Sequence, residues 1–232
     1  MKAEHNRRRT RRLLRGFDRA VTTTQGFLDS RYGPVLARKL ITEARQEYAR
    51  LIPELPDLHG RQPFAKFIAA TGWFLAFHRA LAQNGRPVRG AGEFAYALTA
   101  QYVASLPRFA APLIRWLWFS KLFQRRVRFR AKQSQKHRQR GDFVYEYVEG
   151  EAQRFEFGVD YLECAVWTFL KSQGAPELAP YVCALDQLYS DTFGWGLVRS
   201  TTLAEGGPRC DFRFKRGGET RIASTVLPLR EL

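Results

Sequence analysis

The hydrophobic pattern of this chain changes after Gly141, and that change restricts its fold more than any other feature of the sequence. Before Gly141, apolar residues recur at the three- and four-residue spacings of a helix, as they do over residues 34–51. After it, residues 142–148 and 153–159 alternate between polar and apolar and are rich in β-branched and aromatic side chains. A turn at 149–151 separates these two runs, so they predict a β-hairpin.

The order of the other elements indicates the fold class. Four helices are predicted ahead of the hairpin, at residues 34–51, 63–83, 93–106 and 109–123. Behind it, Asp160 and Glu163 have the spacing of a capping box, which predicts a helix from Asp160 to about residue 172. A further helix over 176–189 and a hairpin of 197–203 with 210–215 follow. The sequence thus predicts an α+β fold, with N-terminal helices followed by β-β-α-α-β-β and an antiparallel sheet covered by helices.

The charge of the chain is unevenly distributed. The 232 residues include 38 Lys and Arg against 22 Asp and Glu, a formal charge of +16. Residues 1–20 carry +6, residues 21–120 carry +6, residues 121–140 carry +9 and residues 141–232 carry −5. We therefore expect a basic N-terminal tail (1–20), a helical region ending in a basic segment (21–140) and an α+β region (141–232), within one integrated domain.

The basic run from Arg125 to Arg140 directly follows the aromatic stretch 109–123. One interpretation is a surface that binds an anionic membrane, and the other is a core helix followed by a solvated loop. A nucleic-acid partner is disfavoured, because the chain has no recognised binding motif and its last 92 residues are acidic. No secretory signal is visible and no run of 18 apolar residues occurs, so we expect a cytoplasmic protein, with contact to the inner membrane face as an extension of that prediction. The oligomeric state is left open.

All three cysteines lie in the acidic last region, at Cys164, Cys183 and Cys210. On a helix, Cys183 and Asp186 share one face. On a strand, Cys210 shares its face with Phe212 and Phe214, so its thiol is expected to point inward. The competing interpretation is that each cysteine is a small buried hydrophobic residue. No CxxC spacing supports a metal site and no phosphate-binding loop or GxSxG motif occurs, so no cofactor or metal is predicted.

Residues 141–216 resemble the L-2-amino-thiazoline-4-carboxylic acid hydrolase family. The resemblance is carried by Gly141-Asp142, by Phe157 leading into Cys164, by Cys183 with Asp186, and by the string from Arg199 to Gly206 followed by Cys210-Asp211-Phe212-Arg213-Phe214. It implies a hydrolase that acts on a small-molecule substrate, opening a 2-amino-thiazoline ring and leaving N-carbamoyl-cysteine. The thiazoline-acting enzymes have a His before the last Cys of this pattern, and this chain has Arg209 there.

On this resemblance we expect opening of a C–N bond in a small cyclic amidine-like substrate, by cysteine-dependent catalysis. Cys210 or Cys183 is the expected nucleophile, and Asp186 is its acid/base partner. Arg199, Thr202 and Cys164 are expected to bind substrate, with the Arg199 guanidinium pairing to a carboxylate. The alternative is a non-catalytic ligand-binding or peripheral membrane-associated module on the same scaffold.

Overall fold

The computed structural model describes residues 2–56, 65–136, 142–151 and 153–229. The chain forms two compact units, Met1–Gln101 and Tyr102–Leu232. The boundary between them precedes Gly141, because two helices that come before Gly141 pack on the β-sheet of the second unit. None of the helices among the described residues has the length and apolar character needed to span a membrane.

The first unit consists of helices. They are α1 (Lys2–Tyr32), α2 (Pro34–Leu51), the short η1 (Ile52–Glu54), α3 (Ala65–Gln83) and α4 (Arg89–Ala104), whose last turn extends into the second unit. Gly33, at a φ of 76°, separates α1 from α2, and Pro34 occupies the first turn of α2. The predicted helix over 34–51 is confirmed, and the helices expected at 63–83 and 93–106 correspond to α3 and α4.

The core of this unit is aromatic and aliphatic. The Phe17 and Tyr48 rings stack at 5.6 Å, and the Phe77 and Phe94 rings stack at 4.0 Å between centroids. The segment expected as a basic tail therefore has a structural part as well, because residues up to Ala20 belong to α1 and Phe17 on it is fully buried. An apolar position every third or fourth residue keeps one side of α1 against α2.

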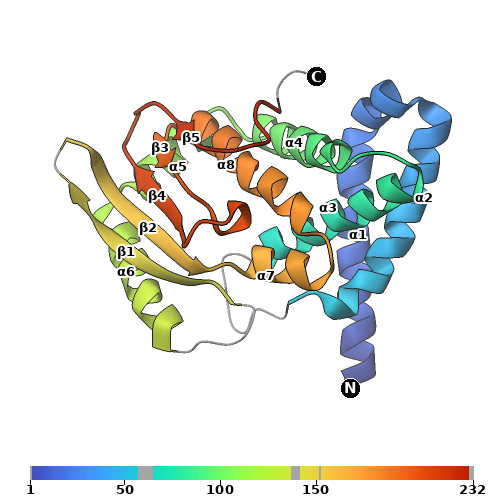
Figure 1. Ribbon diagram of the computed structural model, residues 1–232, viewed down its shortest axis with the longest axis horizontal. Coiled ribbons are helices and arrows are strands. Elements are labelled where there is room, and N and C mark those ends of the chain that lie inside the picture. Colours follow the sequence, from blue (N-terminus) through green and yellow to red (C-terminus); the bar gives the residue numbers. More distant parts are fainter. Residues whose placement is uncertain (1, 57–64, 137–141, 152, 230–232) are drawn as a thin grey trace. The chain divides into compact units, whose positions relative to one another are not determined.

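The second unit is a mixed sheet with helices. Its strands are β1 (Val144–Glu151), β2 (Phe155–Glu163), β3 (Leu197–Arg199), β4 (Cys210–Phe214) and β5 (Arg221–Ile222), in the order β1-β2-β4-β3-β5 (Figure 1). Its helices are α5 (Ala110–Trp118), α6 (Lys121–Lys136), α7 (Ala165–Ser172) and α8 (Ala179–Phe193), with the short η2 (Pro176–Leu178) and η3 (Leu203–Glu205). The predicted α+β fold is confirmed, with β3–β5 as a parallel pair in an otherwise antiparallel sheet.

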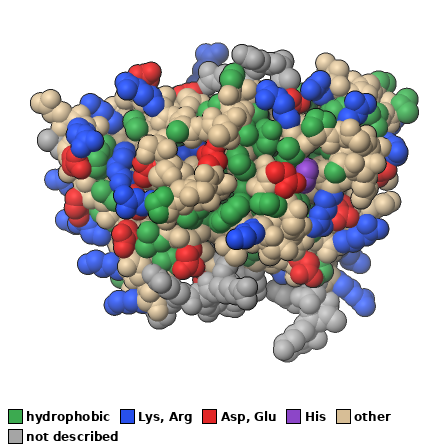
Figure 2. Space-filling view, in the orientation of Figure 1, with side chains coloured by type: hydrophobic (Ala, Val, Ile, Leu, Met, Phe, Trp, Pro, Cys, Tyr) green, Lys and Arg blue, Asp and Glu red, His purple; other side chains and the backbone are tan. Residues whose placement is uncertain are grey.

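The register of the sheet decides which side chains share a face. Cys210 lies opposite Tyr161, Phe212 opposite Val159, and Phe214 opposite Phe157. We call the face that these residues share the helical face, because Trp118, Phe119 and Phe123 of the α5–α6 segment pack on it. The other face, called the open face here, carries Asp211, Arg213 and Lys215. Figure 2 shows basic and acidic side chains interspersed over the part of the molecule where β1, β2 and β4 lie in Figure 1.

The segment 109–140 differs from the sequence-based expectations in two respects. The helix expected over 109–123 is divided into α5 and α6 at Phe119-Ser120, because the Ser120 hydroxyl accepts a hydrogen bond from the Phe123 N–H and begins a new helix. Most of the basic run is helical, since α6 extends to Lys136, and residues 137–140 lie outside the described residues.

The predicted capping box at Asp160 and Glu163 is wrong, because these residues do not begin a helix. β2 continues through both residues, and α7 begins only at Ala165 with Cys164 as its N-cap. The Asp160 carboxylate pairs with Arg213 across the sheet instead of capping a helix. A partner distant in sequence thus outweighed a local capping pattern.

Candidate functional site

Six side chains converge at one end of the helical face of the second unit. Tyr161 comes from β2, Cys164 from the start of α7, Cys183 and Asp186 from α8, Arg199 from the end of β3 and Cys210 from β4. Burial raises the pKa of Tyr161 and of all three thiols, and the nearby Asp186 carboxylate raises each of these pKa values further. We call these six residues the thiol cluster. Sequence reasoning selected five of them and missed Tyr161.

Arg199 is the most unusual member of the thiol cluster, because its side chain is only 1% exposed. Its Nη1 donates a hydrogen bond to the Cys183 carbonyl at 3.0 Å and another to the Asp186 carboxylate. Its Nε and Nη2 have no hydrogen-bond partner among the described residues. These two nitrogens form one edge of the planar guanidinium, the edge that binds a carboxylate through two parallel hydrogen bonds. A carboxylate is the kind of group that this edge of a buried arginine is suited to bind.

Asp186 is the ionisable group of the cluster that titrates closest to neutral pH. Burial raises its pKa to about 6, against the lowering effects of the Arg199 charge and hydrogen bond. Its side chain is 28% exposed, so a small molecule or water can reach it. A carboxyl group with a pKa near 6 can both give and accept a proton at neutral pH, which is the property of a general acid or base.

The three thiols differ in how strongly their surroundings oppose ionisation. Burial raises the pKa of Cys164 to about 12 and that of Cys183 well above its ordinary value. Burial also raises the pKa of Cys210, but the backbone N–H of Leu203 donates to its Sγ at 3.3 Å and the Arg199 charge lowers the pKa. A hydrogen bond and a positive charge both favour a thiolate. Of the three, Cys210 therefore has the surroundings that best support one.

The residues of the thiol cluster lie in a segment that matches the model of a known protein family. A family model for L-2-amino-thiazoline-4-carboxylic acid hydrolase matches residues 73–214, more than half of the chain. The chain belongs to the L-2-amino-thiazoline-4-carboxylic acid hydrolase family. The match confirms the resemblance inferred from the sequence and contains all six residues of the thiol cluster. No curated protein and no solved structure matches the chain.

The departure from the pattern of the thiazoline hydrolases at Arg209 lies on the open face of the sheet. Arg209 forms an ion pair with Asp160 at 3.4 Å, and Asp160 also accepts a hydrogen bond from Arg213 at 2.6 Å. Asp160 is adjacent to Tyr161 on a strand, so the two side chains point to opposite faces. The side chain of residue 209 thus pairs on the face opposite Cys210. Replacement of His by Arg here leaves the described thiol cluster of this thiazoline-hydrolase family member complete.

Thr202 has a structural partner in this family member. Its hydroxyl donates to a Glu205 carboxylate oxygen at 3.0 Å and accepts the Glu205 N–H at 3.1 Å, which caps η3. The other Glu205 oxygen accepts hydrogen bonds from the N–H and hydroxyl of Thr225. Burial raises the pKa of Glu205, but these hydrogen bonds outweigh it and the pKa is lowered overall. The Thr202 hydroxyl therefore holds the turn that leads to Cys210, and its expected contact with substrate stays a prediction.

Tyr161 was missed because the capping box ended the predicted strand at Val159. The signal was present, since Phe157, Val159 and Tyr161 continue the alternation of β2. In the structure the Tyr161 ring packs edge-on against the Phe212 ring, with 5.4 Å between the ring centroids.

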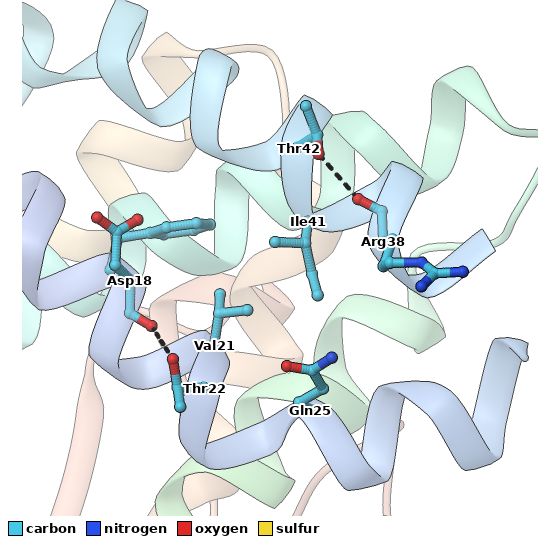
Figure 3. Close-up of a pocket in the computed structure, with 8 residues that line it drawn as sticks. Asp18, Val21, Thr22, Gln25, Arg38, Ile41 and Thr42 are labelled. Atoms are coloured by element: carbon cyan, nitrogen blue, oxygen red, sulfur yellow. Dashed lines mark hydrogen bonds between the residues drawn. The ribbon is translucent and has the colours of Figure 1, made fainter. Parts of the chain in front are cut away.

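Two pockets that described residues line lie away from the thiol cluster. A pocket of about 370 Å³ lies between α1 and α2, where Val21 and Ile41 approach each other (Figure 3). Its Thr22 and Thr42 hydroxyls donate to backbone carbonyls, and the Asp18 carboxylate pairs with Arg45. A groove of about 730 Å³ on the open face is lined by residues such as Ser200, Asp211 and Arg213. Among the described residues no group of His, Cys, Asp or Glu side chains is arranged to hold a metal ion.

Proposed function

We propose that this protein hydrolyses a small cyclic amidine-like substrate that carries a carboxylate, and that the thiol cluster is its active site. The observation that carries the proposal is the free Nε/Nη2 edge of the buried Arg199, next to a carboxyl group with a pKa of about 6 and three thiols. The family name adds support, because it denotes hydrolysis of a ring compound that bears one carboxylate.

Substrate binding is assigned to Arg199. A carboxylate that fills its free edge makes two charge-assisted hydrogen bonds in a site shielded from water, where each is stronger than at the surface. Binding would satisfy two buried donors that are unpartnered among the described residues. This anchoring also fixes the position of the ring relative to Cys210 and Asp186, which lowers the entropic part of the barrier.

The reaction then follows two steps. The Cys210 sulfur adds to the carbon of the C=N group, and the thiol proton passes through Asp186 to the ring atom that departs as its bond to that carbon breaks. In the second step one water molecule attacks the same carbon, the carbon–sulfur bond to Cys210 breaks, and the thiol regains a proton. The overall change is the addition of one water molecule.

The product decides which ring bond opens. In N-carbamoyl-cysteine the carbamoyl carbon keeps its bond to nitrogen, so forming it from a 2-amino-thiazoline breaks the ring carbon–sulfur bond and frees a thiol. For this substrate we propose thiol release in place of the C–N opening expected from the sequence. A coloured thiol reagent distinguishes the two outcomes, because C–N opening frees an amine.

Single substitutions test the roles of the cluster. We expect Cys210→Ala to lower turnover of L-2-amino-thiazoline-4-carboxylate by about 1,000-fold or more. Asp186→Asn should lower kcat by about 100- to 10,000-fold, and Arg199→Lys, which keeps the charge but loses the planar edge, should mainly raise KM. Cys164→Ala is the comparison variant: it removes a thiol of the same cluster whose pKa burial raises to about 12, and it should lower turnover much less than Cys210→Ala. Mass spectrometry of acid-quenched enzyme should find the covalent adduct on Cys210.

Two results would count against this assignment. Full turnover in Cys210→Ala together with loss in Asp186→Asn would show that water attacks directly and that the covalent step is wrong. If the protein binds the carboxylate compound, loses that binding in Arg199→Lys and yet turns nothing over, the non-catalytic ligand-binding module is the correct function.

A further inference from the structure

Helix α5 has an apolar side that no described residue of its own unit covers. None of its nine residues is buried. The exposed large side chains are Leu113, Trp116 and Leu117, and Phe109 precedes them at the N-cap, with 68% of Phe109 and 62% of Trp116 exposed. Spacings of four, seven and eight residues from Phe109 place them on one side of a helix. Large exposed apolar groups at such spacing indicate an interaction surface.

Helix α6 follows α5 in the chain and also exposes apolar residues, with positive charge added. Leu122 and Phe129 are each 62% exposed and lie two turns apart. The helix has no acidic residue. Six of its cations form no ion pair with another described residue: Lys121, Arg125, Arg126, Arg130, Lys132 and Lys136. Arg128 is the exception, with an ion pair to Glu149 at 2.7 Å. The exposed side of α6 thus mixes free cations with two large apolar residues.

The opposite sides of both helices hold them on the sheet. Trp118 stacks on Trp195 at 4.2 Å, Phe119 is buried against Phe157, and the Tyr147 hydroxyl donates to Gln124 at 3.1 Å. These contacts hold α5 and α6 on the sheet, and none of them involves the exposed side chains. The exposed residues are therefore available to a partner, and substituting them should leave the fold intact.

We propose that α5 and α6 form a docking surface for an anionic lipid bilayer. In this arrangement Leu113, Trp116 and Phe129 enter the boundary between headgroups and acyl chains, and the free α6 cations bind lipid phosphates. The positive charge of this surface favours an anionic bilayer over other partners. Unpaired Arg and Lys alternate with exposed aromatic and Leu side chains, which is the composition of helices that lie in a membrane interface. Exposed Leu residues have no role on a nucleic-acid backbone, and a second copy of this surface would repel it through like charge.

Co-sedimentation with lipid vesicles tests the proposal on the full chain. We expect binding to vesicles with about 30 mol% phosphatidylglycerol to exceed binding to pure phosphatidylcholine vesicles by about tenfold or more, and to weaken as salt is added. Leu113→Ser with Trp116→Ser, and separately Arg125→Gln with Arg126→Gln and Arg130→Gln, should each reduce this binding by about tenfold.

The open face supplies a matched control. Arg154→Gln, Val198→Ser and Arg221→Gln together remove two exposed cations and one exposed apolar residue from that face, and should leave vesicle binding unchanged. Circular dichroism confirms that each variant is folded. Quenching of Trp fluorescence by brominated lipid should occur in the parent and fall in Trp116→Leu.

The proposal is overturned by any of four results. They are equal binding to neutral and anionic vesicles, equal loss of binding in the open-face variant, dimerisation that depends on Trp116 without vesicle binding, or oligonucleotide binding without vesicle binding. None of these results depends on turnover, so the proposal stands or fails independently of the hydrolase function.

Discussion

The helical face of the sheet has two ends that are built in opposite ways. At one end, Phe119, Phe157, Leu197 and Phe214 are buried against one another, and the Trp118 and Trp195 rings stack beside them. We call these four buried residues the aromatic end. At the other end, the thiol cluster buries an arginine whose Nε and Nη2 have no partner among the described residues. The same strands, β2, β3 and β4, supply both ends.

The difference shows how one sheet separates stability from chemistry. Each buried aromatic residue contributes apolar burial and ring contacts. A buried polar group without a partner instead costs about 1–3 kcal/mol. Since folded domains are stable by only about 5–15 kcal/mol, the thiol cluster needs a well-packed neighbour. The aromatic end lies two to four residues along the same strands and provides it.

The largest effect on stability is expected at the aromatic end. Phe157 is fully buried, and its ring contacts Trp118, Phe119 and Phe214 among others. Phe157→Ala should therefore lower the free energy of unfolding by about 3–5 kcal/mol, measured by urea denaturation. The control is Phe129→Ala, at a residue 62% exposed, which should change it by less than about 0.5 kcal/mol. Similar losses in both variants would mean that Phe157 does not anchor the sheet.

The aromatic end was easier to predict from the sequence than the thiol cluster. Alternation along 210–214 correctly placed Phe212 and Phe214 on the face of Cys210, because a strand with one buried face must alternate. The spacing of Cys183 and Asp186 also placed both on one side of α8. The end of β2 could not be found from local pattern, since the Asp160 side chain has two arginine partners that are about 50 residues away in sequence.

Very short strands and the hydrogen-bond partners of single side chains also could not be predicted from the sequence, because both depend on residues that are distant along the chain. β5 has only two residues and exists through its parallel pairing with β3. The free edge of Arg199 depends on which of its nitrogens α8 occupies, which is a property of packing. The resemblance to the hydrolase family indicated Arg199, and only the structure indicated which edge of it is free.

The next largest effect concerns pH and belongs to the thiol cluster. The pKa of Asp186 is about 6 in the folded protein against an ordinary value of 3.8. Between these values the folded state holds the proton more tightly than the unfolded state. The stability that this group contributes is thus fully present below pH 4 and lost as the pH rises to about 6. The loss is on the order of 3 kcal/mol.

Asp186→Asn isolates this contribution. Urea denaturation at several pH values should show the difference in unfolding free energy, parent minus variant, falling between pH 4 and pH 6 and staying level above it. Subtracting the variant removes the titration of other carboxyl groups, including Glu205, whose lowered pKa acts in the opposite direction. A difference that stays constant across this range would show that Asp186 titrates at its ordinary pKa, and would remove the support for its acid/base role.

The smallest effect on stability is expected when both charges of the cluster are removed together. Removing one partner of a buried ion pair leaves the other uncompensated, but replacing both with apolar residues of similar size is often neutral or stabilising. Asp186→Leu with Arg199→Met also removes the two unpartnered donors. We expect an unfolding free energy within about 1 kcal/mol of the parent or above it, no dependence on pH from this site, and no turnover. If this variant instead lost as much stability as Phe157→Ala, the pair would be holding the sheet together, and the separation of a stabilising end from a reactive end would be wrong.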